Sequence, residues 1–572
     1  MLLCIKYGNL LDPACGSGNF LTETYLSLRR LENVVLSLLY GGQITMGEAL
    51  NPIQVSIGQF YGIEINDFAA TVAKTALWIA ESQMMKQTED IVHMSLDFLP
   101  LKSYVNIVEG NALRIDWETV VPKAQLNYIM GNPPFVGGMY MSEAQKAEMH
   151  HLFPAVKGVG EMDYVCAWYR QAADMLAGSS IRAAFVSTNS ICQGEQVLTF
   201  WKHMILNWRI HIDFAYPTFV WSSESQGQAK VHCVIVGFSG EMVTNVPKRL
   251  FYSDTNYKIC KNISPYLSDT PTFFIESRSM PLCDVPAMRF GSMPRDGGNF
   301  VLSPEEREDF IRTEPLSEKW IRPYIGAVEF LNNKERFCLW LVDAEPSELS
   351  RCPKVKKRIE GVREFRAASK AAATRKFAQT PTVFCQIAQP NTNYIMVPET
   401  SSGRRKYVPM GFQTPYTIAS NLVFLIPDAD LFEFGVLMSN VHNAWMRMVA
   451  GRLKSDYRYS KDIVYNNFPW PSVNEAQRQR IIQTAQAILD ARANHPTSTL
   501  AEMYDDILMP PDLRKAHQQN DRAVMDAYGM PIGQTTEASC VAELMRRYQE
   551  LTRAKKYYRV ACISVAKNSF LR

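Results

Sequence analysis

The sequence predicts an α/β fold built on a mostly parallel sheet, followed by a mixed α+β region and a helical C-terminal region. Short apolar stretches alternate with longer helix-like stretches over the first 240 residues, and this alternation implies crossover connections between parallel strands. Residues 241–470 are rich in Pro, Asn and aromatic positions and show little helical period. After Pro469-Trp470-Pro471 a helical pattern returns. We therefore expect domains at residues 1–240, 241–470 and 471–572.

The expected elements of the first region follow one another in a regular order. Strands are predicted at residues 5–11, 59–65, 104–108, 126–130, 183–187 and 231–238, helices at 20–39, 67–86 and 164–176, and a loop or insertion at 41–58. In helix 67–86, Ala70, Ala73, Leu77 and Ala80 recur at helical spacing. Later helices are expected at 474–494 and 537–555. The stretch 351–376, with ten Lys/Arg against two Glu, is expected to be partly helical.

Composition excludes several classes of protein. The 60 Lys+Arg and 57 Asp+Glu nearly cancel, to a net charge of +3, so a nucleic-acid partner must be argued from local charge. The 12 cysteines include no Cys-x-x-Cys pair, which gives no zinc or disulfide pattern. The start lacks a secretory signal, and no apolar run is long enough to span a bilayer. We expect a soluble, cytoplasmic protein without a membrane partner and without a metal site.

A glycine-containing turn follows the first predicted strand, in the sequence Leu-Asp-Pro-Ala-Cys-Gly-Ser-Gly-Asn-Phe of residues 11–20. Gly16 and Gly18 let the backbone turn sharply and approach a ligand, and amide groups at the start of the next helix face that ligand. The pattern is neither a dinucleotide fingerprint nor a phosphate loop. Asp12 can pair with an ammonium group, so S-adenosyl-L-methionine is the predicted cofactor. A purely structural turn is the alternative.

The cofactor residues predicted from this turn are Asp12, Pro13, Ala14, Gly16, Gly18, Asn19 and Phe20. Glu64, followed by Ile65, ends the second strand, and an acidic residue there can accept both ribose hydroxyls. Asn111, followed by Ala112, ends the third strand and can accept a hydrogen bond from the adenine amino group of the cofactor. An ordinary surface Glu and a turn-forming Asn are the alternatives for these two positions.

The most specific signal is Asn132-Pro133-Pro134-Phe135 after the fourth strand. Two prolines give up two backbone donors, which a simple core strand has no use for. Methylation of an exocyclic amino group does use this pattern. The side-chain oxygen of Asn132 and the carbonyl of Pro133 can accept hydrogen bonds from the two N–H groups of the amine. These bonds localise the lone pair of the nitrogen and stabilise the positive charge that develops on it. Positioning does much of the work, with no metal or covalent nucleophile.

In double-stranded DNA the target amino group is paired, so the base must flip into the site at a cost of a few kcal/mol. Phe135 can stack on the flipped base. The stretch 214–221 offers a second aromatic face, for which Phe219 is the candidate. An ordinary core aromatic is the alternative for Phe219.

At these motifs the chain resembles the gamma-order amino-methyltransferases. Three further segments resemble the MmeI-like branch of type IIL restriction–modification enzymes: Phe-Val-Ser-Thr-Asn-Ser-Ile-Cys-Gln-Gly-Glu-Gln at 185–196, Ile-Arg-Pro-Tyr-Ile-Gly at 321–326 and Gly-Arg-Leu-Lys-Ser-Asp-Tyr-Arg-Tyr-Ser at 451–460. The resemblance implies a Rossmann-like class I methyltransferase sheet, adenine N6 methylation, a target-recognition domain and a helical tail. By likeness, Asp12, Gly16 and Glu64 match cofactor positions, and Asn132, Pro133 and Phe135 match catalytic ones.

The chain departs from this branch at its start. The branch carries a nuclease and a helical spacer ahead of the methyltransferase, whereas here only eleven residues precede Asp12. We therefore expect no DNA cleavage, and a separately encoded restriction endonuclease is a candidate partner. We also expect the segment that covers the methionine end of the cofactor in the branch to be missing. An N-terminally truncated, inactive DNA-binding remnant is thus one alternative to the enzyme.

Reading double-stranded DNA requires cations for phosphates and planar donors for base edges. Three basic stretches fall within residues 350–460: residues 351–376, the run 401–407 and the hairpin-like segment 451–460. A solvated surface is the alternative for each run. The predicted DNA-binding residues are Arg404, Arg405, Lys406, Arg452, Lys454 and Arg458.

A second enzymatic alternative is N4 methylation of cytosine, because the same acceptors activate that amine. Asn rather than Ser at position 132 favours adenine. Protein glutamine methyltransferases use a similar tetrapeptide, but they are much shorter and need no region of this length after residue 240.

Overall fold

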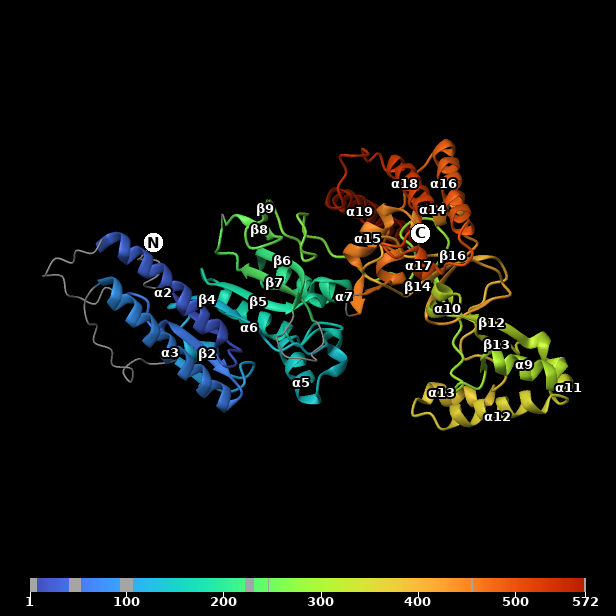
Figure 1. Ribbon diagram of the computed structural model, residues 1–572, viewed down its shortest axis with the longest axis horizontal. Coiled ribbons are helices and arrows are strands. Elements are labelled where there is room, and N and C mark those ends of the chain that lie inside the picture. The colour runs from blue at the N-terminus through green and yellow to red at the C-terminus, as the bar shows by residue number, and fades with distance from the viewer. Residues whose placement is uncertain are drawn as a thin grey trace. The chain divides into compact units, whose positions relative to one another are not determined.

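The computed structural model describes residues 8–40, 53–92, 106–221, 231–244, 246–453 and 456–569. The predicted strands 5–11 and 104–108, the predicted loop 41–58 and Lys454 therefore lie partly or wholly outside the described residues. The chain forms two compact units, Met1–Phe274 and Ile275–Arg572, which are drawn in Figure 1. Each unit is considered by itself below.

The first unit is built on one large sheet with the strand order β3-β2-β1-β4-β5-β7-β6-β8-β9. Its strands are β1 (Asn9–Asp12), β2 (Phe60–Glu64), β3 (Asn106–Glu109), β4 (Leu126–Gly131), β5 (Arg182–Thr188), β6 (His211–Trp221), β7 (Val231–Ser239), β8 (Lys248–Phe251) and β9 (Tyr257–Cys260). Strands β1 to β5 are mutually parallel, whereas β7 runs antiparallel to both β5 and β6. The α/β class and the mostly parallel sheet expected from the sequence are confirmed.

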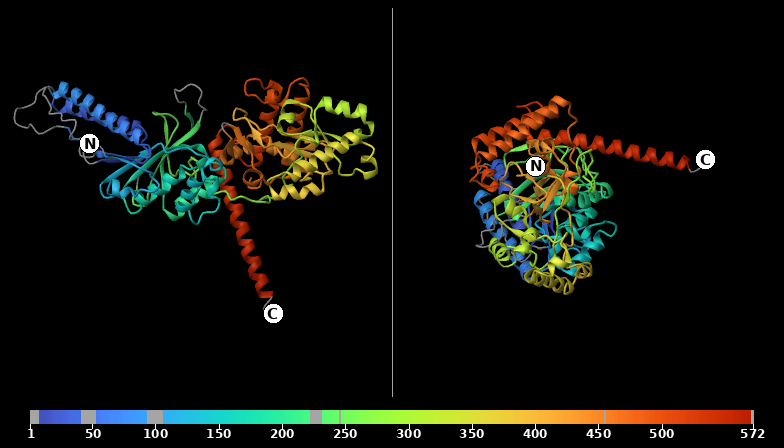
Figure 2. Two further views of the ribbon diagram at one scale, coloured as in Figure 1. Left: turned by 90° about the horizontal axis from the view of Figure 1, so that it is seen from below. Right: turned by 90° about the vertical axis from the view of Figure 1, so that its right-hand side faces the viewer.

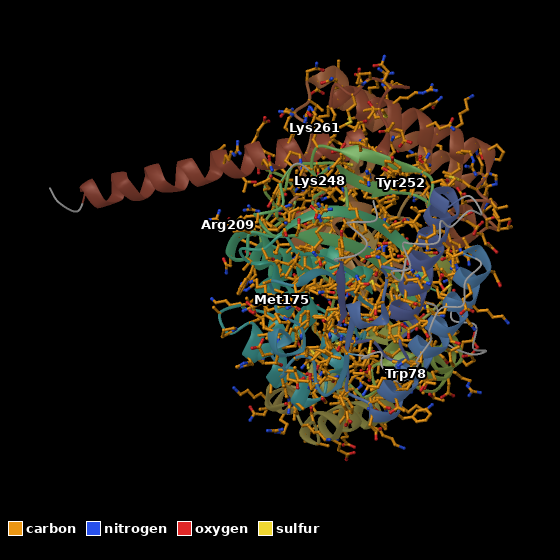
Figure 3. All side chains as sticks on the ribbon, turned by 90° about the vertical axis from the view of Figure 1, so that its left-hand side faces the viewer. Trp78, Met175, Arg209, Lys248, Tyr252 and Lys261 are labelled. Carbon is orange, nitrogen blue, oxygen red and sulfur yellow. The ribbon has the colours of Figure 1, made fainter. Side chains whose placement is uncertain are left out.

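The helices of the first unit connect these strands. They are α2 (Asn19–Tyr40), α3 (Asp67–Val92), α4 (Trp117–Val120), α5 (Glu143–Leu152), α6 (Cys166–Leu176), α7 (Gly194–Gln196) and α8 (Lys202–Asn207). From β1 the chain winds outward through β2 and β3, then returns to β4 and winds the other way to β5. Right-handed crossovers therefore place α2 and α3 on one face and α6 on the other. Trp78 on α3 and Met175 on α6 are labelled on opposite sides of the strands in Figure 3.

This winding makes a topological switch point between β1 and β4, where ligands bind in open α/β sheets. The turn after β1 begins at Asp12, and the proline tetrapeptide follows directly after β4. The sequence separates these two motifs widely, but β1 and β4 are hydrogen-bonded neighbours. The fold therefore brings both motifs to one edge.

Helices α2 and α3 lie side by side over their half of the sheet (Figure 1). The predicted alanine and leucine face of α3 is buried in a core with Leu10, Tyr25 and Phe60. Asn66 begins α3 as its cap, with its side-chain oxygen accepting the Ala69 N–H at 2.9 Å. Small alanines on this face let α3 approach the turn after β1 closely, which matters for Gly18 below.

The sheet extends further than the sequence pattern indicated. Strand β6 covers the aromatic stretch 214–221 and lies between β7 and β8. Strands β8 and β9 continue the sheet past residue 240, and the compact unit runs to Phe274. In Figure 3, Lys248 and Tyr252 mark the region of β8, and Lys261 directly follows β9.

The second unit contains three small sheets, with the strand orders β10-β18-β14-β16, β11-β13-β12-β17 and β15-β20-β19. Its strands are β10 (Arg289–Phe290), β11 (Val301–Leu302), β12 (Ile321–Ile325), β13 (Phe337–Leu339), β14 (Tyr394–Pro398), β15 (Thr400–Ser401), β16 (Gly411–Gln413), β17 (Ile418–Ala419), β18 (Val423–Pro427), β19 (Gly451–Leu453) and β20 (Asp456–Arg458). The expected mixed α+β region with short strands is confirmed.

The helices of the second unit lie partly where no helical period was visible. They are α9 (Pro304–Thr313), α10 (Ala327–Asn332), α11 (Pro346–Leu349), α12 (Pro353–Ala367), α13 (Ala372–Lys376), α14 (Leu431–Leu437), α15 (Asn440–Val449), α16 (Glu475–Ala493), α17 (Leu500–Met503), α18 (Pro511–Ala527) and α19 (Glu537–Ser569). Helix α14 was missed because it is buried on nearly all sides, so its sequence has no polar face to reveal a period.

The helical C-terminal region is confirmed by α16, α18 and α19. Helices α16 and α18 pack against each other, and Pro511 begins α18 at a position where a missing N–H costs nothing. The end of α19 extends away from the rest of its unit (Figure 2). Among the described residues, no helix is long and apolar enough to span a membrane, and no cluster of metal-binding side chains occurs there.

Candidate functional site

Asp12 ends β1 and is almost completely buried at the switch point. One carboxylate oxygen, Oδ1, accepts the Ala14 N–H at 3.0 Å, while Oδ2 is shielded from water and has no hydrogen-bond partner among the described residues. Burial raises the pKa of Asp12 to about 7; the hydrogen bond from Ala14 opposes this rise and the nearby charge of Glu64 adds to it. A buried acceptor of this kind is costly unless a ligand satisfies it.

The turn after Asp12 needs its glycines. Gly16 and Gly18 have φ values of +53° and +83°, which residues other than glycine rarely adopt. A Cβ on Gly18 would also stand 2.9 Å from the Cβ of Ala73 on α3. The turn is held from the other face by Trp168 of α6, whose indole N–H donates to the Pro13 carbonyl at 3.0 Å. These contacts fix the conformation of the predicted cofactor segment.

Glu64 lies beside this turn at the end of β2. Its Oε2 accepts the Gly16 N–H at 2.8 Å, and its Oε1 accepts the Asn66 N–H at 2.9 Å. Each carboxylate oxygen has a second lone pair for a ligand donor. Ile65 follows with 68% of its surface exposed, which is an uncovered apolar side chain next to the acid. Asn19 is exposed and Phe20 is half-buried at the start of α2.

Asn111 is tied to protein partners on both sides of its amide. Its Nδ2 donates to Glu148 of α5 at 2.9 Å, and its Oδ1 accepts the Leu113 N–H at 2.9 Å. Glu148 also accepts from Tyr164 and pairs with Arg114. The buried Ala112 accepts the Trp117 indole N–H through its carbonyl. The geometry thus favours the turn-forming interpretation of Asn111 that the sequence left open.

The proline tetrapeptide leaves the carboxyl end of β4. The Asn132 side-chain oxygen is shielded from water and accepts no hydrogen bond from any described residue. Pro133 is buried, Phe135 is half-buried and Pro134 is exposed. Asn132 therefore supplies an acceptor with an unmet hydrogen bond, on a backbone that the two prolines stiffen.

Gly131 joins the two motifs physically. A Cβ placed on Gly131 would stand only 2.5 Å from Asp12 Oδ1. Only glycine permits this approach, so the residue that precedes Asn132 lies directly against the Asp12 carboxylate. The predicted cofactor turn and the predicted reaction motif are adjacent in space.

Sequence reasoning missed a second group of polar side chains at this edge. In the segment after β5, Asn189 Nδ2 and Gln193 Oε1 are buried and have no hydrogen-bond partner in the described part of the chain. Asp163 lies beside them, with its Oδ2 accepting the Thr188 hydroxyl at 2.8 Å. Burial raises the pKa of Asp163. The segment 185–196 was noticed only for its family resemblance, because no spacing rule marks it as a site.

Phe219, the second stacking candidate, is half-buried near the carboxyl end of β6. Its partner across the ladder is Cys233 on β7, which in turn pairs with Thr188 on β5. Phe219 therefore lies at the same edge as Asn132, three strands away, or about 14 Å across the sheet. The Trp221 ring lies 6.2 Å from it.

In the second unit, two of the three basic stretches come together. Strands β19 and β20 pair as a hairpin, and β20 pairs with β15, after which residues 402–406 turn back. The Gly403 N–H approaches Asp456 Oδ1 at 3.4 Å. This cluster brings together Arg404, Arg405, Lys406, Arg452 and Arg458.

The side chains of this basic cluster differ in their freedom. Arg404 and Lys406 are exposed. Arg452 lies over the Tyr457 ring at 4.0 Å and donates to its hydroxyl. Arg458 is exposed but pairs with Glu399 at 3.1 Å, and burial lowers the pKa of Arg405. Arg404 and Lys406 are thus the members readiest to meet a phosphate.

The third basic stretch, on α12 and α13, proves partly structural. Arg366 is completely buried and donates hydrogen bonds to five backbone carbonyls, those of Pro294, Arg295, Phe377, Thr380 and Val383. Lys354 and Arg358 pair with Asp309 and Glu306 of α9. Arg366 therefore holds two segments, 294–295 and 377–383, together and is not available to DNA.

We expect the substitution Arg366→Met to destabilise the second unit by about 3 kcal/mol or more, because it leaves five buried carbonyls without their hydrogen-bond donor. Thermal or urea unfolding of the full chain measures this. Arg363→Met, on the exposed face of the same helix, is the matched control and should unfold like the parent. Equal unfolding midpoints for the two variants would contradict the structural role of Arg366.

Comparison with known proteins gives a consistent result along the whole chain. Residues 4–252 match the family described as the DNA-methyltransferase domain of MmeI, residues 269–472 its target recognition domain, and residues 473–555 its C-terminal domain. A solved structure of the type IIL restriction–modification enzyme MmeI in complex with DNA is 43% identical, with a TM-score of 0.86, over 96% of this chain and 74% of that one.

Among curated proteins, DNA methyltransferase A of Bacillus subtilis (strain 168) is 40% identical over 545 residues, which is 95% of this chain. The match covers 61% of that relative, so the chain spans about three fifths of its length.

Proposed function

The chain belongs to the MmeI family of DNA methyltransferases, and on that premise we propose that it transfers a methyl group from S-adenosyl-L-methionine to N6 of a flipped-out adenine at a specific site in double-stranded DNA. The proposed context is a restriction–modification system, or descent from one. The observation that carries the proposal is the buried Asn132 Oδ1 at the switch point, which has no partner among the described residues. The preceding residue, Gly131, lies directly against Asp12, whose Oδ2 is also without a described partner.

The chemistry follows from the two acceptors. The lone pair of an aromatic amine is delocalised into the ring, so the nitrogen is a poor nucleophile. Asn132 Oδ1 and the Pro133 carbonyl accept hydrogen bonds from its two N–H groups, which favours a tetrahedral nitrogen with a localised lone pair. Because both acceptors are fixed before the base arrives, they stabilise the developing positive charge without reorganisation. Phe135 and Phe219 are the proposed stacking partners of the flipped base.

The residues of the turn after β1 fit the proposed cofactor. When bound, S-adenosyl-L-methionine supplies an electrophilic methyl group on a positively charged sulfur. Asp12 Oδ2 is a buried anionic acceptor suited to the ammonium of its amino-acid part, and Glu64 retains lone pairs for ribose hydroxyls. Gly16 and Gly18 keep the turn free of side chains, and the exposed Ile65 offers an apolar surface to the adenine ring.

Affinity for the donor is expected to depend on pH through Asp12. With a pKa of about 7, this carboxyl group is largely protonated at pH 5.5 and must lose its proton to pair with an ammonium. Affinity should therefore rise about tenfold per pH unit up to about pH 7 and level off above it. Calorimetric titration of the full chain with the donor from pH 5.5 to 7.5 measures this. The Asp12→Asn variant should bind weakly with a flat profile, and a flat profile in the parent would contradict the assignment.

Double-stranded DNA is the proposed macromolecular partner. The basic cluster supports it, because cations gathered at one small sheet suit phosphate contacts. Arg404, Arg405 and Lys406 lie in the turn after β15, and Arg452 and Arg458 lie on β19 and β20. Lys454, in the same hairpin sequence, is proposed to act with them. A separately encoded endonuclease remains a proposed further partner, and the cytoplasm is the proposed location.

The deciding experiment is to incubate the full chain with a tritiated methyl donor and plasmid or genomic DNA, then digest to nucleosides. We expect the label on N6-methyladenine alone, and methylation-sensitive sequencing then maps the site. Label on N4-methylcytosine would replace adenine by cytosine as the target. Absence of transfer together with absence of donor binding by calorimetry would favour a DNA-binding remnant.

A further inference from the structure

Two apolar side chains stand in solvent on the turn that follows the tetrapeptide. The turn η2 (Gly138–Tyr140) leaves Met139 88% exposed and Tyr140 82% exposed. Only three residues separate Met139 from Phe135, so the chain can carry it at most about 14 Å away. Large apolar side chains this exposed, this close to a reaction site, indicate a contact that forms with a partner.

The turn is firmly held below these side chains. The Val136 carbonyl accepts the Tyr164 N–H at 2.9 Å. Gly138 packs so tightly on the next turn that a Cβ would stand 2.3 Å from the Gly160 carbonyl oxygen. The Tyr140 N–H closes η2 on the Gly137 carbonyl at 2.8 Å.

We propose that Met139 and Tyr140 form a wedge that enters the DNA base stack and fills the space left by the flipped adenine. This inference rests on the proposed function and adds a positioning role for two residues outside the tetrapeptide. Flipping removes stacking from both neighbours of the target base. Apolar side chains such as Met insert between base steps, and an aromatic ring can stack on an orphaned base.

The rigid mounting and the two side chains act together. Apolar surface that is exposed in the free protein leaves water when it enters the stack, which stabilises the open duplex. Because η2 belongs to the anchored segment that follows Phe135, the wedge stays at a fixed distance from the acceptors of Asn132 and Pro133. Insertion of the wedge into the base stack and binding of the flipped adenine by the tetrapeptide therefore occur in one step.

The test compares a Met139→Ala/Tyr140→Ala double variant with the parent on two duplexes carrying the mapped site. One duplex is fully paired, and the other has an abasic position opposite the target adenine, which lowers the cost of flipping. We expect transfer by the double variant to slow roughly tenfold or more on the paired duplex and to recover on the abasic one. Met242→Ala, another exposed methionine of the first unit, is the control and should match the parent.

A second readout does not depend on transfer. With 2-aminopurine in place of the target adenine, the parent should raise fluorescence on binding and the double variant should raise it much less. Equal fluorescence and equal rates on the paired duplex, or an equal deficit on both duplexes, would overturn the wedge. If the parent neither methylates nor raises fluorescence, the proposed function itself fails, and the wedge with it.

Discussion

The substitution Asn132→Ala is expected to reduce methyl transfer by a factor of about 100 to 1000 or more while leaving the protein folded. Removing a single preorganised donor or acceptor at a developing charge typically has this effect. Asn132 contributes one of the two acceptors in the proposed mechanism, and the Pro133 carbonyl alone cannot accept hydrogen bonds from both N–H groups of the adenine amine. Rates are measured by tritium transfer to the mapped site.

The structural context makes this variant unusually informative. Asn132 Oδ1 is buried without a partner among the described residues, a state that costs folding free energy. Its removal should therefore leave the unfolding midpoint unchanged or raise it, which is the opposite direction to the effect on activity. Donor affinity by calorimetry and DNA retention by gel shift should match the parent. Full transfer activity in Asn132→Ala would contradict the assignment.

Asn132→Ser provides a graded comparison. A serine hydroxyl retains an acceptor but holds it closer to the backbone, so transfer should fall less than with alanine. Equal loss in both variants would indicate that reach, rather than the mere presence of an acceptor, decides the rate.

The second large effect is expected from adding one methyl group at Gly131. In Gly131→Ala the new Cβ would stand 2.5 Å from Asp12 Oδ1 and 3.2 Å from Asp12 Cγ, so the carboxylate or the end of β4 must shift. The cost of such overpacking is about 1–3 kcal/mol. Donor affinity should fall about 10- to 100-fold, since a displaced Asp12 loses a charge-assisted hydrogen bond to the ammonium. Methyl transfer should fall as well, because Asn132 is the next residue.

Gly137→Ala is the matched control for this change. Gly137 lies in the same loop with an ordinary extended backbone, and a Cβ there would meet only the Tyr140 ring at 3.7 Å. It should bind the donor like the parent. Calorimetric titration and tritium transfer on both variants decide the matter, and normal donor affinity in Gly131→Ala would show that the two motifs are not coupled.

The sequence predicted those features that depend on local backbone chemistry. Gly16 and Gly18 adopt the left-handed conformations that a sharp turn after a strand requires. The recurrence of Ala70, Ala73, Leu77 and Ala80 identified the buried face of α3. The tetrapeptide after β4 was recognisable because its prolines are unfavourable in an ordinary strand. Each of these properties can be read from a window of a few residues.

The sequence was uninformative where a residue's surroundings depend on distant partners. Asn111 carries the same amide whether or not it meets a ligand, and its hydrogen bond to Glu148 depends on the packing of α5. Arg366 belongs to a run that reads as a basic surface, yet five carbonyls from two separate segments surround it. Asn189 Nδ2 and Gln193 Oε1, which lack partners among the residues that the structure describes, follow no spacing rule.

The sequence by itself thus determined the alternation of strands and helices in the first region and the conformation of the turn at Asp12, and it singled out the tetrapeptide at Asn132. Only the tertiary structure decided that these two motifs touch through Gly131, that Trp168 holds the turn, and which cations of the basic stretches are free. The reason is physical. Steric limits on φ and ψ act between neighbouring residues, whereas contacts between β1, β4 and α6 arise from burying surface across the whole sheet, which no local pattern encodes.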